Sequence, residues 1–355
     1  MFNPQRLILG RKRRKMTARA LASAIEVSPI TISRLENGAN EPEDETIDAL
    51  AAALGFPRAF FFAEEVDELP AGAASFRSLS SMSAKERDAA LSAGAIAYLF
   101  HDWVAERFNL PDGHIPDVRE DATPDAAARV VRAQWGLGEQ PISNMVKLLE
   151  ANGVRVFSLC EDTKNVDAFS CWRGDRPFVF LNTFKSTERS RFDAAHELGH
   201  LVMHRHGAPQ DSRQAESEAD KFASAFLMPA DDVSSRIRYV PGLDSLVSYK
   251  RRWGVSVAAL NYRLHKLGIV SEWQNRSLNV ELSTRGYRRQ EPEGLPPETS
   301  ALWPQIFTAL WQDRVTREHI AEQLHVPRAE LDMILRHLSG QTSKGSDASA
   351  GLRVV

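Results

Sequence analysis

The stretch HELGH at residues 196–200 constrains this chain more than any other feature of its sequence. Around it, apolar residues recur at intervals of three and four, which predicts an amphipathic helix. On such a helix His196 and His200 project from the same side, one turn apart, so both imidazoles can reach one metal ion. Zinc suits two nitrogen ligands in tetrahedral geometry. Glu197 lies beside the pair, where it can act as the general base that takes a proton from a metal-activated water.

Two histidines do not complete such a site, because a catalytic zinc needs a third protein ligand and one open position. The stretch QAESEADKFASAFLMP at 214–229 predicts a second helix, and its acidic residues are Glu216, Glu218 and Asp220. Glu218 shares a helix face with Phe222, so we expect it to point inward and to be the third ligand. Glu216 is the alternative.

Three further residues of the first helix bear on the site. Gly199 would let the backbone of another element approach closely. His204 and His206 lie near the expected end of the helix, where cationic side chains suit the helix dipole. We expect both of these histidines to be solvated rather than to bind the metal.

Within the first forty residues, the spacing of apolar residues predicts two short helices joined by a tight turn. Thr17 and Ser28 are in position to cap the two helices, and Pro29 stands at the first position of the second, where a missing N–H does no harm. Asn37 and Gly38 end the second helix. The start of the chain has basic residues and no acidic ones, and we interpret them as a face that contacts phosphate: Arg6, Arg11, Lys12, Arg13, Arg14, Lys15 and Arg19.

This pattern, above all VSPITISRLENGANEP at 27–42, resembles the helix-turn-helix of the Cro/C1 (XRE) repressor family. The resemblance covers residue 4 to about residue 60 and implies a small helical bundle whose second motif helix enters the major groove of operator DNA. It implies that Thr17 caps the first helix towards the DNA backbone, and it leaves Arg34 and Asn37 as alternative phosphate contacts. The groove-facing set that it implies is Ser28, Pro29, Thr31, Ser33 and Arg34.

Three short runs before the histidine helix are rich in strand-forming residues: VRVFSL at 154–159, DAFSCW at 167–172 and PFVFLN at 177–182. RGDR between the last two is typical of a hairpin turn. We therefore expect a small antiparallel sheet directly before the helix. Helical periods elsewhere, among them a long connecting or dimerising helix at 83–108, place the chain in a mainly α class with a small sheet, an α+β fold.

RFDAAHELGH, ESEADKFASAFLMP and the sheet before them together resemble the ImmA/IrrE family of metallopeptidases, over roughly residues 140–235. The resemblance implies a bound zinc ion and Glu197 as the general base. The ligand set that it implies is His196, His200 and Glu218. The chain departs from the family at Asp193, where an uncharged residue is common. Asp193 can orient His196 or simply favour the start of the helix.

Composition excludes several classes of protein. The chain has 355 residues, enough for two or three domains, and a net charge of -3. Its two cysteines, Cys160 and Cys171, are too few for a disulfide framework and point to a reducing compartment. The sequence has neither a signal-peptide pattern nor an apolar run of the length that a bilayer requires. We therefore expect a cytoplasmic protein that does not contact membranes.

The segment TREHIAEQLHVPRAELDMIL at 316–335 faintly repeats the motif that begins at Thr17. It lacks the basic cluster, so we interpret it as a packing or dimerisation unit. The expected division of the chain is a helix-turn-helix domain at 1–65, a linker and connecting helices at 66–135, a metallopeptidase domain at 136–275, a helical C-terminal region at 276–340 and a disordered tail at 341–355.

These features lead to one main hypothesis and two rivals. The main hypothesis is a transcriptional regulator, a homodimer on operator double-stranded DNA, whose zinc metallopeptidase domain cleaves a protein partner or the regulator itself on a signal. The partner would be a repressor or a toxin-system protein encoded by a neighbouring gene. The second is a non-enzymatic repressor or antitoxin whose zinc domain senses a ligand or binds a partner protein. The third is a protease whose N-terminal bundle is only an interaction module.

Overall fold

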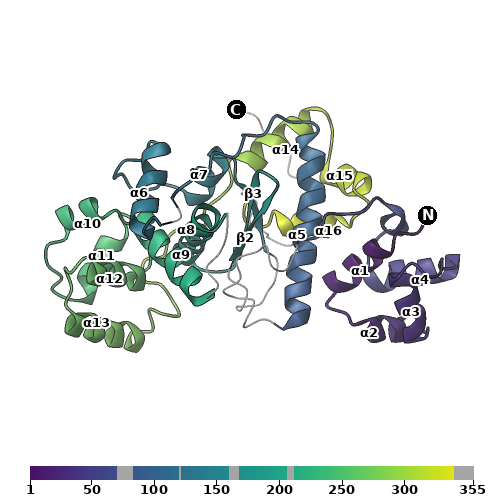
Figure 1. The fold of residues 1–355 in the computed structure, drawn as a ribbon, viewed down its shortest axis with the longest axis horizontal. Helices are drawn as coiled ribbons and strands as arrows, with labels where there is room; N and C mark the ends of the chain where they lie inside the picture. The colour runs from purple at the N-terminus through teal and green to yellow at the C-terminus, as the bar shows by residue number, and fades with distance from the viewer. Residues whose placement is uncertain (70–82, 120, 160–167, 206–211, 340–355) are drawn as a thin grey trace.

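The computed structural model describes the chain in five stretches, 1–69, 83–119, 121–159, 168–205 and 212–339 (Figure 1). These stretches are mainly helical and contain a three-stranded sheet, which confirms the expected fold class. Part of the expected linker, 70–82, and the whole expected tail lie outside the described residues. Among the residues described, no helix combines the length and apolar character needed to cross a membrane.

The N-terminal bundle forms because its helices have local caps and apolar inner faces. The Thr17 hydroxyl accepts a hydrogen bond from the Ala20 amide, and the Ser28 hydroxyl accepts one from the Thr31 amide, both at 3.1 Å, as the sequence predicts. Leu21 is among the fully buried core residues. The elements of the bundle are α1 (Pro4–Arg13), α2 (Ala18–Ala24), α3 (Pro29–Glu36), α4 (Asp44–Leu54) and the short 3-10 helix η1 (Arg58–Phe62).

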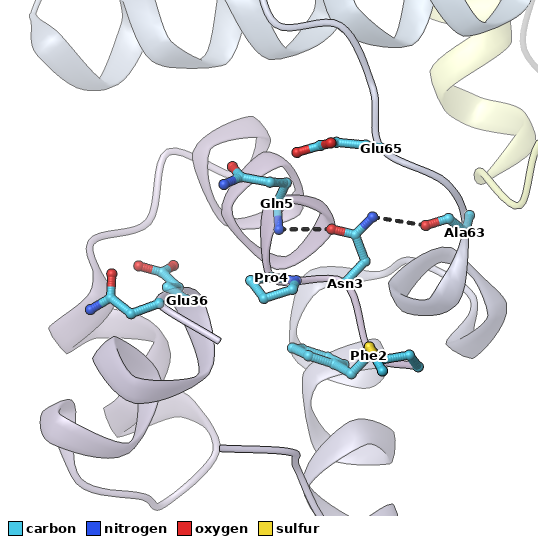
Figure 2. A pocket seen from close by; sticks show the side chains of 9 residues that line it. Phe2, Asn3, Pro4, Gln5, Glu36, Ala63 and Glu65 are labelled. Carbon is cyan, nitrogen blue, oxygen red and sulfur yellow. Dashed lines mark hydrogen bonds between the residues drawn. The ribbon is translucent and has the colours of Figure 1, made fainter. Parts of the chain in front are cut away.

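Asn3 ties the start of α1 to the end of the bundle (Figure 2). Its side-chain oxygen accepts from the Gln5 amide at 3.0 Å, and its side-chain nitrogen donates to the Ala63 carbonyl at 2.9 Å. Glu36 and Glu65 line the shallow pocket beside it. Because these carboxylates give the pocket an acidic wall, it does not suit a phosphate group.

Most of the arginines at the basic start of the chain bond to other parts of the protein. This corrects our interpretation of that segment as a phosphate-binding face. Arg19, on α2, and Arg34, on α3, are exposed. A run of charges in a sequence does not reveal partners that come from distant parts of the chain. Four arginines have such partners: Arg6 bonds to the Glu64 carbonyl, Arg11 to Glu36, and both Arg13 and Arg14 to Glu330.

The long helix α5 (Ala84–Ala105) stands between the N-terminal bundle and the sheet (Figure 1). A capping box starts it, in which the Ser83 amide donates to Glu86 at 2.9 Å and the Glu86 amide donates to Ser83 at 3.3 Å. Tyr98 packs edge-on against Phe178 of the sheet, and α1 packs on the other side. The helix expected to connect or dimerise is therefore a core element that joins the two parts of the chain.

The sheet is mixed rather than wholly antiparallel. Its strands are β1 (Arg155–Ser158), β2 (Ala168–Arg173) and β3 (Arg176–Leu181), in the order β1-β3-β2. β2 and β3 form the expected antiparallel hairpin, whereas β1 pairs parallel with β3. Two reversals of direction, one before β2 and one at the hairpin, give β3 the direction of β1. The residue pattern of each strand does not show which strand is central, so this pairing was not predictable from it.

Helices α8 (Thr187–Met203) and α9 (Ser212–Leu227) pack against each other, and α8 also packs on β2 and β3. Both were expected from the sequence. Three other helices pack against them: α6 (Pro124–Gln134), α7 (Met145–Ala151) and α12 (Val257–Lys266). The remaining helices of this part of the chain lie with α12 at the end of the molecule away from α5 (Figure 1): α10 (Ala230–Arg236), α11 (Leu243–Lys250) and α13 (Glu272–Thr284).

The C-terminal region repeats the geometry of the helix-turn-helix. Its helices are α14 (Leu302–Gln312), α15 (Arg317–Gln323) and α16 (Arg328–Ile334). Thr316 caps α15 as Thr17 caps α2. Residues with a left-handed backbone (positive φ) also recur in the two units at the same sequence spacing as these two threonines. The corresponding pairs are Lys15 and Arg314, Glu26 and His325, and Gly38 and His337.

This second unit turns its last helix inward, against α5 and β1. Glu330 of α16 stands where α3 has Thr31 and is fully buried. Its carboxylate accepts from Nε of Arg13 at 2.7 Å and from Nη1 of Arg14 at 2.5 Å. The unit therefore packs within the chain and holds α1 against the core.

Candidate metal centre

The histidine helix α8 begins at Thr187, where the Ser186 hydroxyl caps it by accepting from the Arg189 amide at 3.4 Å. It places the HELGH residues in the interior. His196 and His200 are each 7% exposed and Glu197 is 3% exposed. Because the two histidines are one helical turn apart, both rings lie on the side of α8 that faces α9.

Gly199 allows α9 to approach α8 closely. A Cβ atom added at Gly199 would lie 3.1 Å from Cδ1 of Phe222 and 3.2 Å from Cα of Ala219. Both separations are shorter than ordinary contacts, so a side chain at this position would push the helices apart. The absence of a side chain thus brings the acidic residues of α9 within reach of the histidines, as the sequence predicts.

Potential ligand atoms of three residues converge between the two helices. Nε2 of His196 lies 3.0 Å from Nε2 of His200 and 3.2 Å from Oε2 of Glu216. Nε2 of His200 lies 3.5 Å from Oε1 of Glu216. Ligands about 2.0–2.1 Å from a tetrahedral zinc stand roughly 3.3 Å apart, so these separations fit the ion. One ligand atom from each of the three residues lies within 4.8 Å of the others.

The outer nitrogens of both rings already have partners. Nδ1 of His196 lies 2.9 Å from a carboxylate oxygen of Asp220, and Nδ1 of His200 lies 2.9 Å from Nδ1 of His204. Since a carboxylate only accepts, Asp220 holds a proton on Nδ1 of His196. The lone pair of its Nε2 then faces the cluster, which is the tautomer that a metal ligand requires.

The electrostatics of the cluster favour a positive charge. Burial lowers the pKa of His196, but its hydrogen bonds to Asp220 and Glu216 raise it to about 10. Burial raises the pKa of Glu216, but the two histidines lower it to about 2. Oε2 of Glu216 is buried and makes no hydrogen bond of good geometry within the described part of the chain. A proton or a metal ion satisfies these groups, and a metal ion would displace the proton.

The structure brings Glu216 to the histidines and not Glu218, which the sequence analysis preferred. The two glutamates lie on opposite flanks of the apolar stripe of α9. Oε2 of Glu218 lies 3.1 Å from Nε2 of His204 instead. His204, expected to be solvated, has a side chain that is only 7% exposed. His206 lies outside the described residues.

Asp220 holds the orienting position that the sequence analysis considered for Asp193. Asp193 forms an ion pair with Lys185 at 2.8 Å. Asp220 was missed as an orienting residue, although its spacing of four from Glu216 places both carboxylates on one flank of α9. That spacing is a signal that could have identified it.

The strand β2 places Ser170 next to the HELGH segment, and the residue after it, Cys171, packs against α5. The Ser170 hydroxyl donates to Oε2 of Glu197 at 2.7 Å, a contact that no sequence pattern indicates. Cys171 is buried, its sulfur lies 3.0 Å from the Tyr98 hydroxyl, and burial raises its pKa to about 12. Cys171 is therefore a packed thiol, and Cys160 lies outside the described residues.

Helix α3 carries the residues that the sequence analysis assigned to the DNA groove. Most of that set is exposed, while Thr31 is half-buried and its hydroxyl lies 2.9 Å from that of Ser28. Ile30 was not predicted, but it is 64% exposed on the same helix and offers an apolar contact for a thymine methyl group. The exposed members of the predicted set are Thr17, Ser28, Pro29, Ser33, Arg34 and Asn37.

Comparison with known families gives the same two parts. Residues 149–265 match the model of a peptidase family described as the IrrE N-terminal-like domain, and residues 8–61 match a helix-turn-helix model. These two matches agree with the expected fusion of an XRE-type helix-turn-helix domain to an IrrE-type domain. No curated protein matches the chain. The range matched by the IrrE N-terminal-like model contains the sheet, α8, α9 and therefore all three residues of the candidate metal centre.

Proposed function

We propose that this chain is a DNA-binding transcriptional regulator whose IrrE-type domain is a zinc-dependent endopeptidase. In this proposal His196, His200 and Glu216 bind zinc and Glu197 is the general base. The observation that carries it is the convergence of acceptor atoms from three residues at 3.0–3.5 Å, while Nδ1 of each histidine is already engaged. A cation supplies the charge that this arrangement requires.

Each side chain has a separate task in peptide hydrolysis. Zinc, when bound, polarises the scissile carbonyl and acidifies water. Glu197 takes the proton of the attacking water and passes it to the leaving amine nitrogen. Ser170 fixes the position of the Glu197 carboxylate through its hydrogen bond at 2.7 Å. Asp220 keeps the proton of His196 on Nδ1, so that Nε2 can donate its lone pair.

The substrate in this proposal is an extended segment of a protein. β2 lies at one edge of the sheet, and within the part of the chain that the structure describes β3 is its strand neighbour. A peptide can add to such an edge through backbone hydrogen bonds. Because β2 carries Ser170, a peptide bound along it would pass close to Glu197. A loop or an unfolded end of a partner, or of the regulator itself, meets this requirement.

The helix-turn-helix domain would direct this activity to a promoter. The exposed face of α3 carries Ser28, Ser33, Arg34 and Ile30, a mixture of polar, cationic and apolar groups suited to base edges in the major groove. We propose binding as a homodimer to a two-fold operator, since domains of this type read half-sites one helical turn apart.

The Glu197→Gln variant tests the enzymatic part of the proposal. Glutamine has nearly the same shape but cannot take the proton, so zinc, fold and DNA binding should remain while cleavage stops. The assay incubates the purified chain with the proteins encoded beside its gene and follows promoter activity in cells with and without stress. If the variant switches the promoter as fully as the unaltered protein, the domain acts as a sensor or binding module, as in a non-enzymatic repressor or antitoxin.

A further inference from the structure

His204 and Glu218 form a hydrogen-bonded pair behind His200, and the mechanism above uses neither of them. Nδ1 of His204 lies 2.9 Å from Nδ1 of His200, and Nε2 of His204 lies 3.1 Å from Oε2 of Glu218. The pair joins α8 to α9. The His204 side chain is 7% exposed and that of Glu218 is 23% exposed. These bonds therefore form largely out of water, where an unmade bond is costly.

One distribution of protons satisfies the three side chains when Nε2 of His200 faces the metal cluster. Glu218, as a carboxylate, accepts, so His204 carries its proton on Nε2. A neutral His204 then has a lone pair on Nδ1, and it accepts the proton on Nδ1 of His200. Nε2 of His200 is left unprotonated, in the state that a metal ligand needs.

We propose that His204 and Glu218 are positioning residues for His200, fixing the tautomer and direction of its ring. The inference rests on the proposed zinc centre and deepens it. His196 has the simpler arrangement, because Asp220 accepts directly from its Nδ1 at 2.9 Å. Each metal-facing histidine is thus held from behind by a carboxylate of α9, in one case directly and in the other through His204.

Neither member of the pair is placed to bind the same ion as Glu216. His204 meets His200 at Nδ1, whereas Glu216 meets it at Nε2, the other side of the ring. Both oxygens of Glu218 already have partners, since Gln214 donates to Oε1 at 2.9 Å. The pair therefore acts on the metal only through the ring of His200.

Zinc affinity of the full chain, measured by competition with a chelating indicator, tests this inference. His204→Phe keeps a ring of similar size and removes the acceptor, so the Kd for Zn²⁺ should rise roughly 10–100-fold. His204→Asn is the matched control, because its amide oxygen can stand near the position of Nδ1 and accept the same proton. It should restore most of the lost affinity.

A second variant covers the case in which His204→Phe does not fold. Glu218→Gln changes a partly exposed residue and leaves an oxygen that accepts without charge. It should weaken zinc binding less than His204→Phe does, and it should keep full stoichiometry at saturating Zn²⁺. Thermal unfolding of the metal-free proteins, expected to remain cooperative in every variant although its midpoint is lower, separates positioning from a loss of fold.

Several results would overturn the inference. His204→Phe could bind zinc as tightly as the unaltered chain, or His204→Asn could lose as much affinity as His204→Phe, which would assign the effect to packing. Loss of stoichiometric zinc from Glu218→Gln would make Glu218 a direct ligand. An unaltered chain that binds no zinc would overturn both this inference and the proposed function. A chain that binds zinc but cleaves nothing would overturn the peptidase alone, and the affinities would still decide this inference.

Discussion

Replacing Glu330 by glutamine should loosen the helix-turn-helix domain from the rest of the chain. Glu330 is fully buried and accepts from Arg13 at 2.7 Å and from Arg14 at 2.5 Å. Glutamine keeps the shape and removes the charge, so Arg13, whose side chain is 5% exposed, stays buried without its carboxylate. Removing one partner of a buried ion pair costs about 3–5 kcal/mol. Arg14 is 29% exposed and can turn to water, so we expect the lower end, about 3 kcal/mol.

Hydrogen exchange of the backbone amides of α1 and α16 measures this cost where it arises, because a chain of several domains need not unfold in one step. A loss of about 3 kcal/mol corresponds to roughly hundredfold faster exchange. Glu318→Gln is the matched control, since Glu318 pairs with Arg328 in the same unit but is 51% exposed, and exposed pairs contribute about 0–1 kcal/mol. Equal exchange in Glu330→Gln and the unaltered chain would refute the reasoning.

Three further variants test other parts of the structure. Gly199→Val should cost about 1–3 kcal/mol and weaken zinc binding, because a Cβ there meets the Ala219 backbone at 3.2 Å; an unchanged unfolding temperature would count against that close packing. The Arg252 guanidinium holds the pKa of Asp232 at about 2, below its ordinary 3.8, so the stability it contributes is full above about pH 4 and is lost as pH falls towards 2. Asp232→Asn should flatten that part of the stability curve, and an acid limb as steep as before would contradict the assignment. Arg34→Ala should weaken binding to a selected operator by roughly 1–3 kcal/mol more than binding to random DNA. If a mobility-shift titration shows the same loss of affinity for both DNAs, Arg34 contacts phosphate rather than a base.

Helix positions and caps could be predicted from the sequence because their causes are local. Thr17 and Ser28 cap the helices that follow them, as a hydroxyl before an apolar period indicates. The same holds for α8, where the spacing of His196 and His200 is meaningful only on a helix. Gly199 was also a reliable signal, since a glycine inside a helix usually has a packing reason.

Which glutamate of α9 meets the two histidines could not be predicted, because two glutamates flank one apolar stripe. Glu216 and Glu218 are two residues apart, and about 200° around a helix separates them. They therefore lie at opposite edges of the buried face, and only the packing of α9 on α8 decides which one meets the histidines. Asp220, on the flank of Glu216, is the residue that would have favoured the flank that the structure turns towards the histidines.

The basic start of the chain shows a second limit of sequence patterns. Charge composition predicts a phosphate-binding face, but Arg13 and Arg14 meet Glu330, which lies more than three hundred positions later in the numbering. Such a pairing depends on how the C-terminal unit docks, and no local pattern reports it. The parallel pairing of β1 with β3 also could not be predicted, because no local pattern reports which strands become neighbours.

The zinc content of two glutamate variants tests the central claim most directly. The unaltered chain should purify with about one equivalent of zinc per chain, because three ligands and one open position make a catalytic site. We predict that Glu216→Ala loses this zinc, while Glu218→Ala retains it under saturating conditions. The reverse result, or full zinc in both variants, would contradict the metal centre described here.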